Sequence, residues 1–197
     1  MMRNSDPPAL PPAVARVVPA FLWGGRIGLW SQGALAIVSG LIFVLAIPVA
    51  IARSTPNAAA ANPGTGPGIF FAICGLVMLL FSVYWSFRYV RFSKQLASPI
   101  GSDRPKKADA LQMLRRGVLS NLIGMGLSLL GAEAITGILF VKALLSPLSQ
   151  GGLVATDPSR LIQPLDIFVV LANTHTVFAH FIGASISLWL LSAVTRD

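Results

Sequence analysis

Polar side chains recur at multiples of seven residues along two long apolar stretches in the second half of the chain. In chain order they are Asn121, Ser128, Lys142, Asp166, Asn173, His180 and Ser187. On an α-helix this spacing forms one stripe, which drifts by about 20° per repeat. Because polar groups in hydrocarbon turn toward the interior of a bundle, the two stripes should face each other. They form either a ladder of interhelical hydrogen bonds or the lining of a transport path, and the residues allow both.

The two stripes also predict how the helices that carry them are aligned. The helices are expected to be antiparallel, with Lys142 and Asp166 level at the outer surface. Counting inward at about 1.5 Å per residue then places Ser128 level with His180. In a transport mechanism, Lys142 and Asp166 would form an outer gate.

Glu133 is an acidic residue inside an apolar stretch, where a lone charge is costly. It lies about 13 Å inward from Lys142 at ~1.5 Å per residue, and it points away from that side chain. His175 has the same predicted depth and points away from Asp166, so we expect Glu133 to face other spans or a neighbouring subunit. Glu133, His175, His180 and Asp166 are candidate ligands for a divalent metal, since carboxylate and imidazole suit such ions. A proton relay or a structural hydrogen bond explains Glu133 equally well.

Small residues at every fourth position of the third apolar stretch predict a helix-packing face. They are Ser120, Gly124, Ser128 and Ala132. Small side chains let helix backbones approach closely in a lipid environment, which supplies no hydrophobic drive for association.

Four apolar stretches must position these residues, and each is long enough to cross a bilayer. We expect spans at about 27–52, 68–92, 115–145 and 165–194, since a spanning helix needs roughly 20 apolar residues. Backbone groups in hydrocarbon must be satisfied within their own segment, so these spans should be helices. Residues 1–12 are expected to be disordered, and 13–197 to form one membrane domain. A short interfacial helix carrying Trp23 and Trp30 should precede the first span. The predicted fold is therefore all-α and polytopic.

The distribution of basic residues predicts the topology. Of 197 residues, 54% are hydrophobic and 11% charged, with a net charge of +8. Basic residues cluster before the first span and in a loop at about 93–114, which places both termini and that loop in the cytoplasm. Trp85 and Tyr89 should form an aromatic belt, with Arg88 and Arg91 anchoring the helix end in the bilayer. The basic loop suits anionic lipid headgroups, and we expect no nucleic-acid partner.

Several classes of protein are disfavoured by the sequence. Phosphate-loop, dinucleotide-binding and nucleophile-elbow motifs are missing, so we do not expect an enzyme, and no cofactor is indicated. A single cysteine, Cys74, cannot form an internal disulfide.

Seven segments between Arg26 and Thr195 resemble a known family. They are GLWSQ (Gly28–Gln32), SVYWSFRYVRFSKQL (Ser82–Leu96), KADALQMLRRG (Lys107–Gly117), NLIGMG (Asn121–Gly126), VKAL (Val141–Leu144), PLDIF (Pro164–Phe168) and AHFIG (Ala179–Gly183). The chain is similar in these segments to the four-span family of the chloroplast inner envelope and its cyanobacterial relatives. That family is known as a Tic protein-import component and as "permease in chloroplasts". The resemblance implies four membrane helices with both termini on the stromal or cytosolic side.

The resemblance also bears on individual residues and on function. Lys142, Asp166, Asn121 and His180 match family positions, whereas plant members carry Gln where this chain has Glu133 and Asn in place of its His175. The family implies either iron passage or service in an import translocon. Without a visible transit peptide, we expect a bacterial member in the plasma membrane or thylakoid.

Two hypotheses of different classes follow. The first is a small permease-like protein that assists movement of iron or another divalent metal ion, working as a homo-oligomer or with partners. The second is a non-catalytic accessory, assembly or translocon-like subunit of a larger membrane complex. The sequence does not identify the ion, the direction of its movement, the number of subunits or the membrane.

Overall fold

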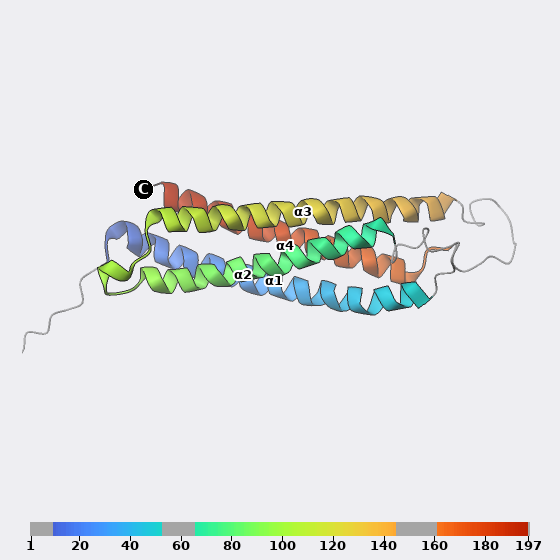
Figure 1. Ribbon diagram of the computed structural model, residues 1–197, viewed down its shortest axis with the longest axis horizontal. Helices are drawn as coiled ribbons and strands as arrows, with labels where there is room; N and C mark the ends of the chain where they lie inside the picture. Colours follow the sequence, from blue (N-terminus) through green and yellow to red (C-terminus); the bar gives the residue numbers. More distant parts are fainter. Residues whose placement is uncertain (1–9, 53–65, 145–160, 197) are drawn as a thin grey trace, which may run out of the picture.

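Four long helices make up most of the computed structural model, which describes residues 10–52, 66–144 and 161–196 (Figure 1). They are α1 (Pro12–Ala52), α2 (Pro67–Leu96), α3 (Lys107–Leu144) and α4 (Pro164–Thr195), with a short 3₁₀ helix, η2 (Gly101–Asp103), between α2 and α3. All four are long and apolar enough to cross a membrane. This confirms the predicted all-α fold with four candidate spans.

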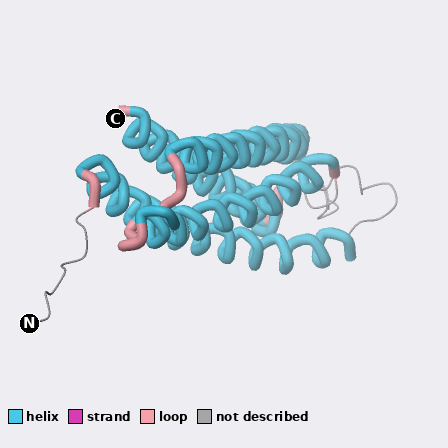
Figure 2. Tube along the Cα trace, turned by 60° about the vertical axis from the view of Figure 1, so that its left-hand side comes forward, coloured by secondary structure: helices cyan, strands magenta, loops and turns pink. Residues whose placement is uncertain are grey.

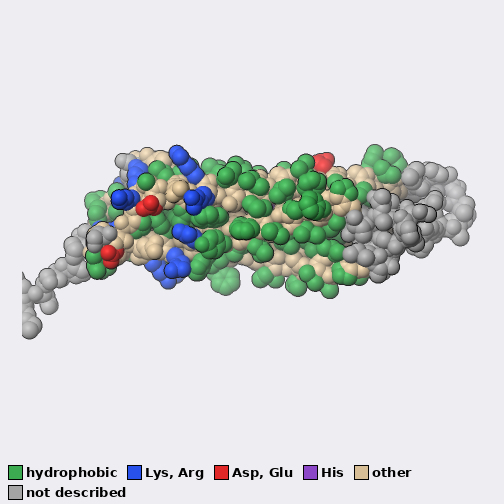
Figure 3. All heavy atoms as spheres, in the orientation of Figure 1, with side chains coloured by type: hydrophobic (Ala, Val, Ile, Leu, Met, Phe, Trp, Pro, Cys, Tyr) green, Lys and Arg blue, Asp and Glu red, His purple; other side chains and the backbone are tan. Residues whose placement is uncertain are grey.

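The helices form an antiparallel bundle in which each packs against its neighbours in the chain. α1 contacts α2 and α4, α3 contacts α2 and α4, and α2 also touches α4 across the bundle. Figures 1 and 2 show that α1 begins, α4 ends and η2 lies at the same end of the bundle. Figure 3 shows Lys and Arg side chains gathered at that end, while apolar side chains cover most of the remaining length. That charge distribution is the one from which a cytoplasmic location was predicted.

The start of α1 differs from the expected separate interfacial helix. α1 runs unbroken from Pro12 to Ala52, with Pro19 inside it. Phe21 is fully buried and packs against Tyr89 and Phe92. The Ser93 hydroxyl donates to the Val18 carbonyl oxygen at 2.9 Å. These contacts tie the first turns of α1 into the bundle, so they continue the span and no separate surface helix forms.

The connection between α2 and α3 is also shorter than the predicted loop at 93–114. α2 continues to Leu96 and α3 already begins at Lys107. The basic residues of that region therefore lie mostly on helix ends. Of the segment predicted to be disordered, residues 1–9 lie outside the described residues, and Pro12 opens α1.

The interior of the bundle contains two larger apolar clusters, a polar layer, and a small third cluster made of Ala36, Leu79 and Ala179. One cluster, at the basic end, includes Phe21, Tyr89, Leu114 and Leu190. The other, at the opposite end, includes Phe43, Ile69, Ile135 and Val169. Buried amide, hydroxyl and imidazole groups lie between them. Apolar packing thus lies on both sides of the polar layer.

Glycines on α3 allow the close approach of its neighbours. Gly117, Gly124 and Gly131, spaced by seven residues, are all buried. A Cβ at Gly131 would lie 2.9 Å from the Ala72 nitrogen and 3.1 Å from the Gly68 carbonyl oxygen. Both atoms belong to the α2 backbone, which has no freedom to move aside.

The face of α3 that was predicted to pack is rotated about the helix axis, away from the glycine line that contacts α2 and α4. Gly124 and Ser128 are buried, whereas Ser120 and Ala132 are half-buried. The glycines at multiples of seven, more than the residues at every fourth position, mark the line of closest contact with α2 and α4.

Replacing Gly131 with alanine should therefore destabilise the bundle. We expect a loss of about 1–3 kcal/mol, typical of overpacking a close contact. The free energy of unfolding would be measured by SDS titration of the protein in mild detergent micelles. Gly126→Ala is the matched control on the same helix, because a Cβ there meets no atom within 4 Å. Equal stability of the two variants would contradict the proposed backbone contact.

Candidate functional site

Gln32, near the middle of α1, links all four helices through its side-chain amide. Its Nε2 donates to Ser82 Oγ on α2 at 2.8 Å and to Asn121 Oδ1 on α3 at 3.1 Å. It also reaches the Ala179 carbonyl oxygen on α4 at 3.1 Å. On its other side, Oε1 accepts the Ser86 hydroxyl at 2.8 Å. Gln32 is fully buried, so these protein groups replace the water that an amide otherwise needs.

Asn121 is the second centre of this polar layer. Its Oδ1 accepts from the Ser82 hydroxyl at 2.5 Å as well as from Gln32. The amide nitrogen of Asn121 donates to the Gly117 carbonyl oxygen at 2.9 Å, one turn back on α3. Gly183 on α4 leaves the space that these side chains fill, since a Cβ there would collide with both Gln32 and Asn121.

His180 joins the layer from α4 and is fully buried. Its Nδ1 lies 3.3 Å from Asn121 Oδ1, and its Nε2 lies 3.1 Å from the Gly75 carbonyl oxygen on α2. Both ring nitrogens therefore face oxygen atoms. A neutral imidazole carries one N–H and donates to one of them, whereas a protonated ring donates to both. The tautomer of the neutral ring decides which oxygen receives the N–H, and Gly124 provides the space for the ring.

The two stripes of α3 and α4 lie against each other, but displaced from the predicted alignment. Asn173 Nδ2 donates to the Ser128 carbonyl oxygen at 2.9 Å, so Ser128 meets Asn173 and not His180. The predicted count started from Lys142 and Asp166, whose side chains are joined at 3.2 Å. Helical side chains lean toward the N-terminus of their own helix. In an antiparallel pair the long Lys142 side chain therefore reaches Asp166 from a different level, which makes the count wrong by one heptad.

Two buried polar atoms near the Ser128–Asn173 contact have no partner within the described structure. They are Ser128 Oγ and Asn173 Oδ1. Both residues are almost completely buried. An unpaired buried hydroxyl or carbonyl oxygen is costly and suits a bound water or ion. This is the part of the interior whose hydrogen-bonding capacity is not used up.

Tyr89 does not belong to the aromatic belt in which the sequence placed it. It is 1% exposed, its hydroxyl lies 2.9 Å from Ser187 Oγ, and its ring meets Phe21 edge to face. Ser187 is therefore paired with Tyr89 on α2. A tyrosine near a helix end can point to the interface or the core, and here Ser187 and Gly117 provide a partner and a space.

The other predicted anchors lie on the outside of the bundle. Trp23 and Trp30 on α1 are exposed, with the guanidinium of Arg26 6.0 Å from the Trp23 ring centre. On α2, Trp85 is half-buried, and Arg88 and Arg91 are exposed. Their positions are compatible with contact to the membrane surface.

The four candidate metal ligands do not come together. Among the described residues, no group of three or more histidine, cysteine, aspartate or glutamate side chains could hold a metal ion. Asp166 is paired with Lys142, and His180 contacts Asn121 and Gly75. Glu133 is exposed on the outer surface of α3. His175 is half-buried, and its Nδ1 has no partner in the described part of the chain.

Five buried polar residues of α1 and α2 were not predicted from the sequence. They are Gln32, Ser39, Ser82, Ser86 and Ser93, all buried and hydrogen-bonded. A signal was present: Gln32 and Ser39 have the seven-residue spacing used for α3 and α4. On α2, the inward positions follow at intervals of four, three and four residues: Ser82, Ser86, Tyr89 and Ser93. These spacings mark the inward face of a bundled helix.

The fold and this site define a class: a multi-pass membrane protein whose four-helix bundle is closed around a hydrogen-bonded polar layer. The chain belongs to the family described as "Protein of unknown function (DUF3611)", whose model matches residues 11–195. This agrees with the resemblance found in the sequence. It is also 35% identical over 177 residues to "Protein TIC 21, chloroplastic" from Arabidopsis thaliana. That match covers 87% of this chain and 55% of the relative, so the chain spans about half of the relative's length. No solved structure matches the chain.

The role of Gln32 can be tested with Gln32→Leu. The variant loses contacts to all three other helices, and we expect the free energy of unfolding in SDS titration to fall by roughly 1–3 kcal/mol. Ser31→Ala is the matched control, because the Ser31 hydroxyl bonds to carbonyl oxygens of its own helix, Ile27 at 2.6 Å and Gly28 at 3.4 Å. If both variants unfold like wild type, Gln32 does not hold the helices together.

Proposed function

We propose that the protein is a non-catalytic subunit of a larger membrane complex, in a bacterial plasma membrane or thylakoid, and that it docks through the outer face of α3. The observation that carries this proposal is Glu133, a carboxylic acid exposed on the surface of a membrane-crossing helix. An acid that faces lipid is costly, and the cost reaches about 2.5–3.5 kcal/mol at the centre of a bilayer. A protein partner that supplies a hydrogen bond or a positive charge removes much of that cost.

The shape of the same face supports a helix as the partner. Gly126 and Gly137 lie on the side of α3 that carries Glu133, and a Cβ at either would meet no atom within 4 Å. Small residues around a polar group let a second helix approach closely and share hydrogen bonds. Within the bundle, by contrast, Asn121 Oδ1 accepts a hydrogen bond from Gln32 and lies 3.3 Å from His180 Nδ1. A closed interior fits a structural subunit, and the family resemblance includes a translocon component.

This proposal is tested by isolating the tagged full chain from its native membranes in mild detergent. We expect an assembly of fixed stoichiometry, much larger than the 20.8 kDa chain, that Glu133→Leu dissociates without lowering the stability of the bundle. Thr174→Val is the matched control, since the exposed Thr174 hydroxyl bonds only within α4, to the Val170 carbonyl oxygen. A wild-type protein that runs as a single chain, or a Glu133→Leu protein that keeps its complex, overturns the proposal.

A second candidate is permease-like passage of iron or another divalent metal ion. The unpaired Ser128 Oγ and Asn173 Oδ1 favour it, because they leave buried oxygen atoms available to an ion or water. If this candidate holds, wild-type protein in liposomes raises uptake of labelled Fe²⁺ or Mn²⁺ above that of empty liposomes. Asn173→Leu should return it to background, while the neighbouring Thr174→Val should not. Wild-type flux equal to that of empty liposomes would exclude passage through this chain alone.

A further inference from the structure

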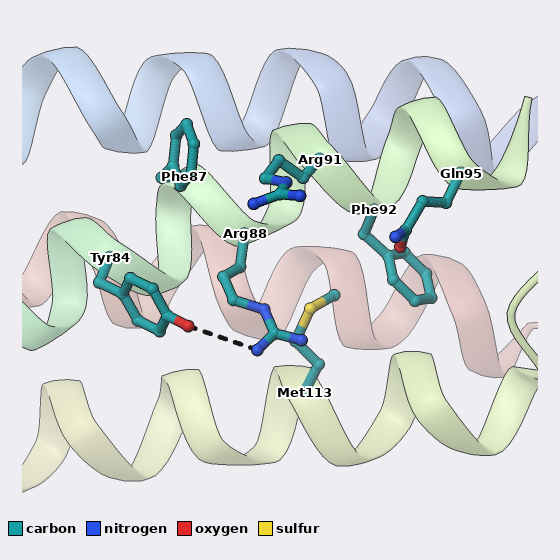
Figure 4. Close-up of a pocket in the computed structure, with 7 residues that line it drawn as sticks. All are labelled: Tyr84, Phe87, Arg88, Arg91, Phe92, Gln95 and Met113. Atoms are coloured by element: carbon teal, nitrogen blue, oxygen red, sulfur yellow. Dashed lines mark hydrogen bonds between the residues drawn. The ribbon is translucent and has the colours of Figure 1, made fainter.

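Two adjoining hollows open between α2 and α3 at the basic end of the bundle. They have volumes of about 250 Å³ and 270 Å³. Four residues line both of them: Arg88, Phe92, Gln95 and Met113. Arg91 lines the first hollow, and Arg116 lines the second. Figure 4 shows Arg88 extending from α2 toward Met113 on α3, with Arg91 one turn farther along α2. Positive charge from two helices therefore converges on one place.

Aromatic contacts hold the guanidinium of Arg88 without neutralising it. Its Nη1 donates to the Tyr84 hydroxyl at 3.4 Å, and its central carbon lies 5.7 Å from the Trp85 ring centre and 6.0 Å from that of Tyr84. Stacking of this kind fixes the plane of an arginine and leaves its remaining N–H groups available. No ion pair is recorded for Arg88 in the described part of the chain. It is therefore oriented and still able to bind an anion.

The acidic residue of the second hollow is already engaged elsewhere. Asp109 lines that hollow, and its Oδ2 accepts the backbone N–H of Lys106 at 2.9 Å, at the first turn of α3. Arg116 is exposed, and no ion pair is recorded for it among the described residues. The charged residues that line the two hollows are thus three arginines, Arg88, Arg91 and Arg116, and one carboxylate, Asp109, which caps α3. The net charge of this lining is positive, which favours an anionic ligand.

The position of the hollows identifies the kind of anion. They lie where α2 and α3 emerge from the apolar part of the bundle, beside Tyr84 and Trp85, at the depth typical of interfacial aromatic residues. Phe87, Phe92 and Met113 add apolar walls, which suit the glycerol and upper acyl region of a lipid. Arginine pairs with phosphate or sulfonate oxygens through two parallel hydrogen bonds.

We propose that this place is a binding site for one anionic membrane lipid, whose headgroup phosphate or sulfonate is held by Arg88 and Arg116 while its chains follow the apolar surface of α2. The surface attraction of a basic segment is worth about 1 kcal/mol per charge and fixes no stoichiometry. A specific lipid-binding site differs from such surface attraction in two respects. It holds one lipid per chain, and its affinity depends on particular arginines.

Native mass spectrometry of the delipidated full chain in detergent tests the site, with phosphatidylglycerol and phosphatidylcholine added in competition. We expect one phosphatidylglycerol per chain, preferred at least tenfold over phosphatidylcholine. Arg88→Gln with Arg116→Gln should abolish that preference, and Arg116→Gln alone should weaken it. Lys94→Gln with Arg115→Gln is the matched control, because it removes the same charge from exposed residues of the same two helices that do not line the hollows.

Three outcomes would overturn the proposal. In the first, the control pair reduces phosphatidylglycerol retention as much as the Arg88 and Arg116 pair, which means that surface charge alone binds the lipid. In the second, phosphatidylcholine is retained equally well. In the third, millimolar inorganic phosphate displaces the lipid from wild-type protein, which assigns the site to a soluble anion. Thermal unfolding of every variant shows whether the fold is intact, and the single Arg116→Gln variant serves if the double variant is unstable.

Discussion

The hydrogen bonds of Gln32 are the interaction on which the rest of this bundle depends. Hydrocarbon offers no water to a polar group, so an amide inside a span must find its partners on neighbouring helices. Gln32 finds them on all three, at Ser82, Asn121 and the Ala179 carbonyl oxygen. One side chain thereby fixes the rotation of α1 and its depth relative to α2, α3 and α4. Gly183 follows from the same constraint, because it has to leave room for this contact.

The four spans and the facing stripes could be predicted from the sequence, whereas the alignment of the stripes could not. Spans are marked by long apolar stretches, and stripes by the recurrence of Asn121, Ser128, Asn173 and His180 at multiples of seven residues. Alignment depends on how far a side chain reaches along the helix, and the count from Lys142 did not include that reach. Gln32 was missed for another reason. Its stripe on α1 has only one further member, Ser39, and the contacts of Gln32 depend on side chains from three other helices.

Residues near the helix ends show why burial there is hard to predict. Tyr89 and Trp85 are four positions apart on α2, and both suit an interfacial belt by composition. Tyr89 instead points inward to Ser187, while Trp85 remains half-buried beside Arg88. The first turns of α1 show the same ambiguity, and Phe21 places them in the core. Amphipathic aromatic residues are stable in either place, so the choice is made by whether another helix offers a partner and a space.

Polar groups on the outside of this molecule therefore carry more information about function than those inside it. In a bundle whose interior groups bond mostly to one another, a change at Gln32 or Asn121 alters stability before it alters any interaction with the surroundings. Glu133 is exposed, so the packing of the four helices does not account for its carboxylate, and lipid would penalise it. Arg88 is exposed, so its charge can be solvated in many orientations. The contacts with Tyr84 and Trp85 nevertheless hold it in one. The interior thus accounts for why the four helices stay together, and these two outward positions indicate what the assembled bundle meets in the membrane.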